Sequence, residues 1–470
     1  MHLRNLIQVF SFLLIFPAFS TGQHQLPLIT GKARFSVEQG TIECDLTLSE
    51  YAHYDAYVIR LNTGLNILNI QDVASEPYII GYDRSLVDSL NTDETNAYYF
   101  PSEDRKGTFL PSKLRFQYVG KYPVIQDTLQ LRYQKTDWRG NVAFNNHILR
   151  VDGLQSAWFP TIYDINNQYA LNEVRYDIEI ECSDCEYLYI NGNEPVKGQK
   201  ARFKSEVPRE MYLFLGKYDV QKSKGITLLN TDFSETQLQT FSNLNTNVSN
   251  FLKSYTNIPY NQDIYWVQGN ITSVSNAWSF ISYPTFTTCG YPPYDLKSSF
   301  NESYKSMFLQ TIAHELGHYY FGMLKKYNDI RENIINEGFA EFLSLKYLES
   351  IQNNDYVAEL VDVKLSFIND KDFTFEPIGS FKGLESTNDR QTYAYDYQTI
   401  VLVCIEKEIG KEKMKKWIQL LLKENKPLSS FDFLKATLKQ AVNNDKIYES
   451  VVNQYLLGPN TLEKINKMLQ

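Results

Sequence analysis

The residues most able to do chemistry in this sequence are His314, Glu315 and His318, which form a His-Glu-x-x-His motif. On an α-helix, positions i and i+4 lie on one face, so both imidazoles can point at the same spot. Glu315 is one position along, where its carboxylate can take a proton from a water molecule bound between the histidines. This spacing favours a catalytic zinc ion with a carboxylate base beside it.

A catalytic zinc ion needs three protein ligands and one exchangeable position, so the motif by itself lacks one ligand. Glu337 lies 19 residues after His318, within Asn336-Glu-Gly-Phe-Ala340. That distance allows the chain to turn and bring a second helix antiparallel to the first. We therefore expect His314, His318 and Glu337 to bind one Zn²⁺ per chain, with Glu315 as the general base.

Two alternatives for the motif are weaker. The first is an ordinary amphipathic helix whose histidines are solvated, but the flanking stretches 311–313 and 319–321 make this helix apolar on nearly all sides. Two histidines and a carboxylate in a buried helix need partners or a metal. The second is a structural zinc site, which usually has four ligands rich in cysteine. No cysteine stands near the motif in the sequence.

Composition and charge exclude other classes of function. The net charge is −9, so nothing indicates a nucleic-acid-binding surface. Hydrophobic residues make up 43% of the 470 residues, enough for a large core, and the length suggests about three domains at most. We expect a peptide or protein substrate and no nucleic-acid partner.

The N-terminus resembles a secretory signal peptide. His2 and Arg4 precede the apolar run 6–19, and the small residues 20–22 follow it. A membrane anchor is the alternative, but a run of about 14 apolar residues is short for a span. We expect residues 1–22 to be cleaved, the mature chain to have no membrane span, and the protein to be exported to a periplasm, a cell surface or the extracellular space.

The five cysteines suggest no catalytic nucleophile. Cys182 and Cys185 could form a metal knuckle, but a second Cys or His pair nearby is absent. In an exported protein the two are expected to lie at a β-turn, either as a disulfide or as free thiols. Cys404 lies in an apolar run and is predicted to be a core residue. The odd number leaves at least one thiol unpaired.

Strand-like and helix-like patterns segregate along the chain. Short alternating runs separated by Gly, Asn and Asp turns fill residues 27–205, as in Tyr57–Leu61, Lys113–Val119 and Tyr176–Ile180. A helix is expected at Glu235–Tyr255 and strands at Asp263–Val267 and Trp278–Tyr283. Further helices are expected at Tyr304–Lys325, Asn333–Glu349, Asn354–Phe367, Tyr397–Glu408, Lys411–Glu424 and Phe431–Asn443.

This segregation predicts an α+β fold. We expect an antiparallel β domain at residues 23–208, followed at residues 209–470 by a mainly helical zinc-peptidase domain. The small sheet before the motif helix resembles a thermolysin-like lobe, in which the sheet edge lies beside the zinc and can pair with an extended substrate.

Four stretches resemble the gluzincin aminopeptidase family, which includes alanyl aminopeptidases and leukotriene hydrolases. His314–Gly322 is similar to the family's HExxHxWFG, and Asn336–Ala340 follows at the family's distance. Tyr395–Gly410 is similar to a tyrosine-led helix ending in acid-Ile-Gly, and Ala157–Pro160 more weakly resembles the end of the family's β domain. The resemblance covers most of residues 30–465. It implies a short, two-domain member without the family's C-terminal helical domain.

The resemblance also implies a role for a tyrosine. In such an enzyme Tyr395 would donate its hydroxyl hydrogen bond to the oxyanion formed during hydrolysis. Tyr393 and Tyr397 flank it, and any one of the three could merely pack. Glu341 is i+4 from Glu337 and would share its helix face. It could orient a zinc histidine, or it could be an ordinary solvated glutamate.

One stretch departs from the family. The exopeptidase signature GxMEN should fall at 273–277, where Asn276 replaces the acid that grips the substrate's free amino group. Asparagine supplies no charge, and charge-assisted hydrogen bonds are roughly twice as strong as neutral ones. Other acids could supply the charge; the candidates are Asp263, Glu302 and Glu341.

Three functions therefore remain open. The first is a zinc metallopeptidase of the aminopeptidase kind with altered recognition of the substrate N-terminus. The second is an endopeptidase of the same fold. The third is a catalytically silent, zinc-containing protein that binds peptides, although Glu315 is the residue that such a protein has least reason to keep.

Overall fold

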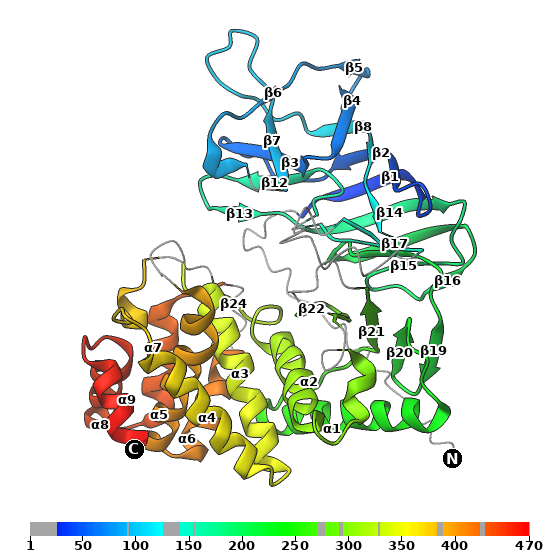
Figure 1. Ribbon diagram of the computed structural model, residues 1–470. Coiled ribbons are helices and arrows are strands. Elements are labelled where there is room, and N and C mark those ends of the chain that lie inside the picture. The colour runs from blue at the N-terminus through cyan, green and yellow to red at the C-terminus, as the bar shows by residue number, and fades with distance from the viewer. Residues whose placement is uncertain are drawn as a thin grey trace, which may run out of the picture.

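The fold is α+β, as the sequence pattern predicts. The computed structural model describes residues 26–91, 94–125, 142–145, 147–153, 156–270, 278–290, 295–327, 330–382, 389–423 and 428–469. Strands gather in the N-terminal part and helices in the C-terminal part. In Figure 1 the β part, blue to green, lies above the helices, green to red, and a small sheet lies between them.

Among the described residues, three sheets build the β part. The first is β17 (Lys200–Glu210), β14 (Glu173–Cys182), β1 (Leu28–Ser36), β2 (Thr41–Ser49), β8 (Lys113–Lys121), β4 (Leu65–Asp72) and β5 (Tyr78–Ile79). The second is β16 (Val196–Lys197), β15 (Tyr187–Ile190), β18 (Leu213–Gly216), β11 (Ile148–Val151), β10 (Ala143–Asn145) and β9 (Val124–Ile125). The third is β13 (Tyr169–Ala170), β12 (Thr161–Asp164), β3 (Tyr57–Asn62), β7 (Thr95–Tyr99) and β6 (Asp83–Arg84).

The pattern of β14 shows why this region forms sheets. Buried and half-buried side chains alternate along the whole strand. Because successive side chains of a strand point to opposite faces, this alternation presents one apolar face to the core. The expected antiparallel pairing holds for most pairs, but β1 pairs with β14 in parallel. Parallel partners need a long crossover, and the chain between β1 and β14 supplies it by building many of the other strands.

The change from the β part to the second part comes later than residue 208. Strand β18 is fully buried and pairs with β11 and β15, so it completes a sheet of the β part. The next sheet begins with β19 (Val220–Ser223) and continues through β20 (Ile226–Leu229), β21 (Ile264–Gly269), β23 (Thr285–Cys289) and β22 (Trp278–Ser282). Strand pairing therefore places the boundary between Gly216 and Val220. The run Leu213–Gly216 is too short for its pattern to show which sheet it joins.

Helices fill the rest of the described chain. They are α1 (Glu235–Thr256), α2 (Lys305–Tyr320), α3 (Glu332–Ser350), α4 (Asn354–Asn369), the π-helical turn η7 (Thr392–Tyr397), α5 (Gln398–Ile409), α6 (Lys411–Lys423), α7 (Phe431–Val442), α8 (Asp445–Val451) and α9 (Thr461–Leu469). The sequence analysis missed α8 and α9. None of the described helices is long and apolar enough to cross a membrane.

Two helix boundaries differ from those expected. The motif helix was expected to reach Lys325, but α2 ends at Tyr320 because Phe321 is extended and Gly322 has φ +120°. Such a φ value is a conformation that glycine adopts readily. The helix expected to start at Tyr397 is preceded by the π-helical turn η7. Such turns inside helices are frequently found at functional sites.

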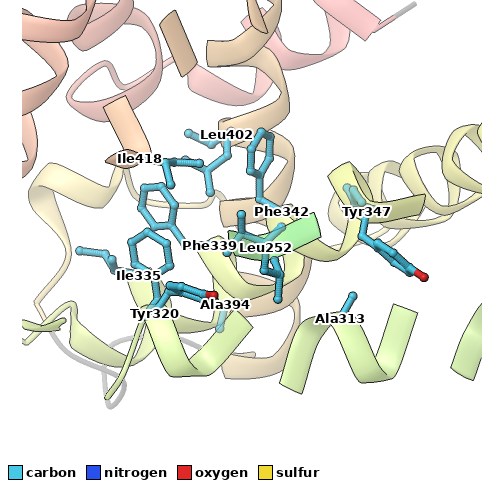
Figure 2. Packing of buried hydrophobic residues seen from close by; sticks show 14 of the residues in the cluster. Leu252, Ala313, Tyr320, Ile335, Phe339, Phe342, Tyr347, Ala394, Leu402 and Ile418 are labelled. Atoms are coloured by element: carbon cyan, nitrogen blue, oxygen red, sulfur yellow. The ribbon is translucent and has the colours of Figure 1, made fainter. Parts of the chain in front are cut away.

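The core of the helical part is aromatic and aliphatic. Phe339 of α3 stacks on Phe321, with ring centroids 4.4 Å apart, and meets Trp417 of α6 edge-on. Figure 2 shows Phe339 and Ile335 of α3 close to Tyr320 of α2. This packing fixes α3 against α2, and these two helices carry the predicted metal ligands.

The cysteines agree with the sequence analysis. Cys182 and Cys185 form a disulfide at the end of β14, one of the two states expected for them. Cys44, Cys289 and Cys404 are free and buried. Burial raises the pKa of the Cys404 thiol to about 12, so it stays protonated and is unsuited to act as a nucleophile.

Candidate metal centre and active site

Helix α2 presents both histidines of the motif on one face. The Nε2 atoms of His314 and His318 lie 3.1 Å apart, and their rings meet edge-on at 4.7 Å. Oε2 of Glu337, from α3, lies 3.5 Å from Nε2 of His314 and 3.2 Å from Nε2 of His318. The structure thus brings together the three predicted ligands from two helices, although Glu337 lies 19 residues after His318.

These distances fit a single zinc ion. Donor atoms about 2.0–2.1 Å from a tetrahedral ion lie roughly 3.3–3.4 Å from one another. The observed separations of 3.1, 3.2 and 3.5 Å bracket that value. Oε2 of Glu337 is buried and makes no hydrogen bond with any group that the structure describes. A buried carboxylate oxygen that faces two imidazole nitrogens without making a hydrogen bond is costly, and a cation shared with the imidazoles would satisfy it.

The close approach of α2 and α3 depends on small residues. A Cβ atom added at Gly317 would lie 3.0 Å from Cα of Ala340. A side chain at this position would therefore push the two helices apart. Gly338 of α3 packs closely against Gln398 of α5. A Cβ atom added at Gly338 would lie 2.2 Å from Cγ of Gln398.

We expect Gly338→Ala to destabilise the protein by about 1–2 kcal/mol, measured by chemical unfolding. Helix propensity alone would favour alanine by about 1 kcal/mol, but overpacking a well-packed core typically costs about 1–3 kcal/mol. Gly81→Ala is the control, because a Cβ at Gly81 meets nothing within 4 Å. If Gly338→Ala is as stable as Gly81→Ala, the side chain of Gln398 can move aside without cost and the prediction is wrong.

In each histidine the second ring nitrogen, Nδ1, contacts an oxygen atom on the side away from the three converging donors. Nδ1 of His314 lies 2.9 Å from Oε2 of Glu341, and Nδ1 of His318 lies 3.3 Å from the carbonyl oxygen of Phe321. Such contacts fix the ring orientation and leave Nε2 for the metal. Glu341 is buried, so of the two roles open to it the structure supports orientation of His314 rather than a solvated glutamate.

The electrostatics of the cluster favour a cation. Burial tends to lower the pKa of His314, but Glu337 and Glu341 outweigh burial and raise it to about 10. Burial tends to raise the pKa of Glu337, but His314 and His318 hold it well below its usual range. Without a metal, a proton on His314 helps to balance the carboxylates. A divalent cation between the same donor atoms would neutralise the carboxylates in place of the proton.

Glu315 lies beside the three converging donors and is not one of them. It is 7% exposed and follows His314 on α2, outside the group of three converging donors. Burial raises its pKa, while the charges of His314 and His318 lower it. It lines the two cavities that meet at the site.

Of the three neighbouring tyrosines, Tyr395 is the one at the site. Its ring stacks on that of His314, with centroids 5.8 Å apart and planes 22° apart. The hydroxyl of Tyr393 donates to the carbonyl oxygen of Glu376, and Tyr397 is fully buried against Phe375. The π-helical turn η7 therefore directs one tyrosine to the site and the other two into the core.

Two cavities extend from the site. One, of about 930 Å³, runs between the β part and the helical part, and the other, of about 770 Å³, runs along α2 and α4. Both are lined by Ser279, His314, Glu315, Gln391 and Tyr395. Strand β22 is the last in its sheet among the described strands, and its residues Ser279, Ile281 and Ser282 line the larger cavity. A sheet edge thus lies beside the site, as expected.

The acids considered as replacements for the missing charge lie at different distances from the cavities. Asn276 itself lies outside the described residues. Asp263 and Glu302 line neither of the two cavities, and Glu341 is engaged with His314. The larger cavity is instead lined by three acids of the β part, which the sequence analysis did not single out: Asp152, Glu173 and Glu210. No spacing relates them to the motif, so no sequence signal could have found them.

Comparison with known proteins agrees with this geometry. Residues 289–455 match the family described as "Peptidase family M1 domain". Curated protein sequences give no significant match. Native yeast LTA4 hydrolase is similar in structure, with TM-score 0.59 and 13% identity, over 92% of this chain and 67% of that one. Yeast LTA4 hydrolase in complex with bestatin gives TM-score 0.61 and 15% identity, over 94% and 71%.

An M1 zinc metallopeptidase mutant from Deinococcus radiodurans, bound to a Tyr-Ser-Ala substrate, gives TM-score 0.57 and 12% identity, over 92% of this chain and 93% of that one. At these identities the structural likeness establishes the fold. The matched segment 289–455 contains α2, α3 and η7, and so every predicted site residue. The family match over residues 289–455 and the shared fold support the gluzincin aminopeptidase family that the sequence motifs resemble.

Proposed function

We propose that this protein hydrolyses peptide bonds with one zinc ion per chain, held by His314, His318 and Glu337, and with Glu315 as the general base. The observation that carries the proposal is the convergence of three donor atoms from α2 and α3, 3.1 to 3.5 Å apart, at the junction of two cavities. Glu315 and Tyr395 line the same junction. The family match supports the class of reaction.

The chain's own residues can carry out the proton transfers. A zinc ion bound here would lower the pKa of a coordinated water to about 7 and polarise the substrate carbonyl. Glu315 accepts the proton of that water and passes it to the leaving amine. Tyr395 donates its hydroxyl hydrogen bond to the oxyanion. Burial keeps the pKa of Tyr395 above its ordinary value, so the hydroxyl keeps its proton.

We expect Tyr395→Phe to lower kcat/KM by about 10²- to 10³-fold, because an oxyanion donor is typically worth about 2.7–4 kcal/mol. Steady-state kinetics on one peptide would measure it. Tyr393→Phe is the matched control, since it removes the hydroxyl that donates to Glu376 and lies in the core. If the two variants lose activity equally, Tyr395 does not act on the oxyanion.

We further propose that the enzyme acts as an aminopeptidase with altered recognition of the substrate N-terminus. An ammonium group needs a carboxylate in place of the one lost at Asn276. Asp152, Glu173 and Glu210 supply acids on the wall of the larger cavity. An endopeptidase remains the second candidate, because two cavities share the site residues and offer room for substrate beyond its first residue.

One peptide series separates the three possibilities. Zinc-loaded, folded protein is incubated with peptides that differ only in acetylation of the N-terminus, with and without chelator, and products are identified by mass spectrometry. We expect zinc-dependent release of the first residue from free peptides and at least about tenfold slower cleavage after acetylation, because a charge-assisted contact is lost. Equal internal cleavage of both forms would indicate an endopeptidase. Binding without any product would indicate the silent protein and overturn the proposal.

Export of the mature chain, after removal of residues 1–22, is part of the same proposal. The disulfide between Cys182 and Cys185 supports it, because disulfides persist mainly in oxidising compartments. N-terminal sequencing of the native protein and its detection outside the cytoplasm would test it.

A further inference from the structure

Lys364 of α4 is a buried lysine close to the site for which the proposed mechanism has no role. It is 7% exposed, and its Nζ atom lies 2.8 Å from Oε1 of Glu341 and 3.2 Å from Oδ1 of Asp396. The same atom donates a hydrogen bond of 3.2 Å to the carbonyl oxygen of Tyr395. An ammonium group has three protons to donate, so three acceptors from two other elements, α3 and η7, satisfy it completely.

One end of this network reaches the metal centre. The two oxygens of the Glu341 carboxylate have different partners. Oε2 lies 2.9 Å from Nδ1 of His314. Oε1 lies 2.8 Å from Nζ of Lys364 and accepts a hydrogen bond of 2.8 Å from Nε2 of Gln310. A carboxylate held on both oxygens cannot rotate away from the imidazole. Lys364 therefore helps to fix the ring of His314 through Glu341, without touching any of the three donor atoms.

The other end reaches the turn that carries the tyrosine. Asp396 follows Tyr395 in η7. Lys364 forms an ion pair with the side chain of Asp396 and donates a hydrogen bond to the backbone of Tyr395. In a π-helical turn the backbone is not held by the ordinary i to i−4 bonds alone. The position of the Tyr395 ring over His314 therefore depends on the contacts that Lys364 of α4 makes with this turn.

We propose that Lys364 is a positioning residue that couples the orientation of His314 to the placement of Tyr395. This inference rests on the proposed peptidase function. Without the ammonium group, Glu341 and Asp396 would be two buried carboxylates with no cation between them, and a buried charge that has lost its partner is strongly unfavourable. Both would rearrange, and the zinc histidine and the oxyanion donor would lose their alignment together.

The test compares Lys364→Met with a matched control, Lys346→Met. Lys346 is also buried, and it bridges Glu349 and Glu406 between α3 and α5 without contact with the site residues. For Lys364→Met we expect about tenfold weaker zinc binding, the low end of the range typical for residues that orient ligands. We also expect kcat to fall at least about tenfold with KM changed less than about twofold, because the alignment serves the transition state.

Lys346→Met should lose a comparable amount of thermal stability while zinc affinity and kcat stay within about twofold of wild type. Lys364→Arg keeps the positive charge and should recover most of both losses. Equal effects of the two methionine variants on kcat and zinc affinity would overturn the proposal, because both lysines would then act through stability alone.

A second variant keeps the proposal testable if Lys364→Met does not fold. Asp396→Asn leaves the contact between Lys364 and Glu341 in place, so kcat should fall severalfold while zinc affinity changes less than about twofold. If Asp396→Asn instead weakens zinc binding and leaves kcat unchanged, Asp396 does not act through Tyr395, and the proposal is overturned. The zinc measurement needs no turnover. A wild-type chain that binds zinc but cleaves nothing would therefore refute the peptidase function and still show whether Lys364 orients His314.

Discussion

Replacing Glu315 with glutamine is expected to lower kcat by about 10³-fold while the protein keeps its zinc. A positioned general base typically contributes about 10²- to 10⁴-fold, and here the same carboxylate would both take the water proton and return it to the leaving amine. Glutamine has nearly the same shape but no basic oxygen. Because Glu315 lies outside the group of three converging donors, zinc content measured by atomic absorption should stay at the wild-type level.

The matched control is Glu302→Gln, the same chemical change at an exposed position paired with Lys305. It should retain full activity. The Glu315→Gln variant would speak against the mechanism in either of two cases: it keeps more than about a tenth of the wild-type kcat, or it loses its zinc. In the first case another group is the base. In the second, Glu315 belongs to the metal centre.

Replacing Glu337 with glutamine should weaken zinc binding by more than the roughly 10- to 100-fold typical of residues that only orient a ligand. Glutamine removes the negative charge that the two imidazoles face. Zinc should accordingly stop stabilising the fold. For the wild-type chain, zinc at about 1,000 times its dissociation constant adds about 4 kcal/mol to the free energy of unfolding.

Unfolding curves recorded with chelator, and again after zinc is restored, would measure this difference. The wild-type chain should regain both stability and activity when zinc returns, whereas Glu337→Gln should regain neither at the same zinc concentration. Equal zinc-dependent stabilisation of the two proteins would place the third ligand elsewhere. That result would remove the basis of the proposed function.

The metal centre is the part of the site that the sequence could predict best. An i, i+4 pair of histidines has one arrangement on a helix, so His314 and His318 were bound to share a face if the segment was helical. The buried surroundings of that helix also followed from its flanks. Glu337 was predictable because the 19-residue distance from His318 allows the chain to turn and bring a second helix back to the first. The close approach of the two helices at Gly317 and Ala340 is seen only in the structure.

Other parts could not be read from the chain. Nothing in the pattern of 392–397 announces a π-helical turn, yet that turn decides which of Tyr393, Tyr395 and Tyr397 reaches the site. A lysine on an amphipathic helix is ordinarily solvated, so Lys364 gave no sign of burial. Its role becomes visible only when α3, α4 and η7 are packed together.

What the sequence by itself determined is local chemistry: the helical face that holds two imidazoles, the carboxylate beside them, the alternation that builds sheets and the segregation of strands from helices. These features depend on residues within a few positions of one another, where helix and strand geometry fix the outcome. Tertiary structure alone decided the boundary after Gly216, the parallel pairing of β1 with β14, the placement of three acids of the β part on the cavity wall and the burial of Lys364. Each of these depends on contacts between segments far apart in the chain, and the free energy of such contacts comes from how whole elements pack, which no local pattern records.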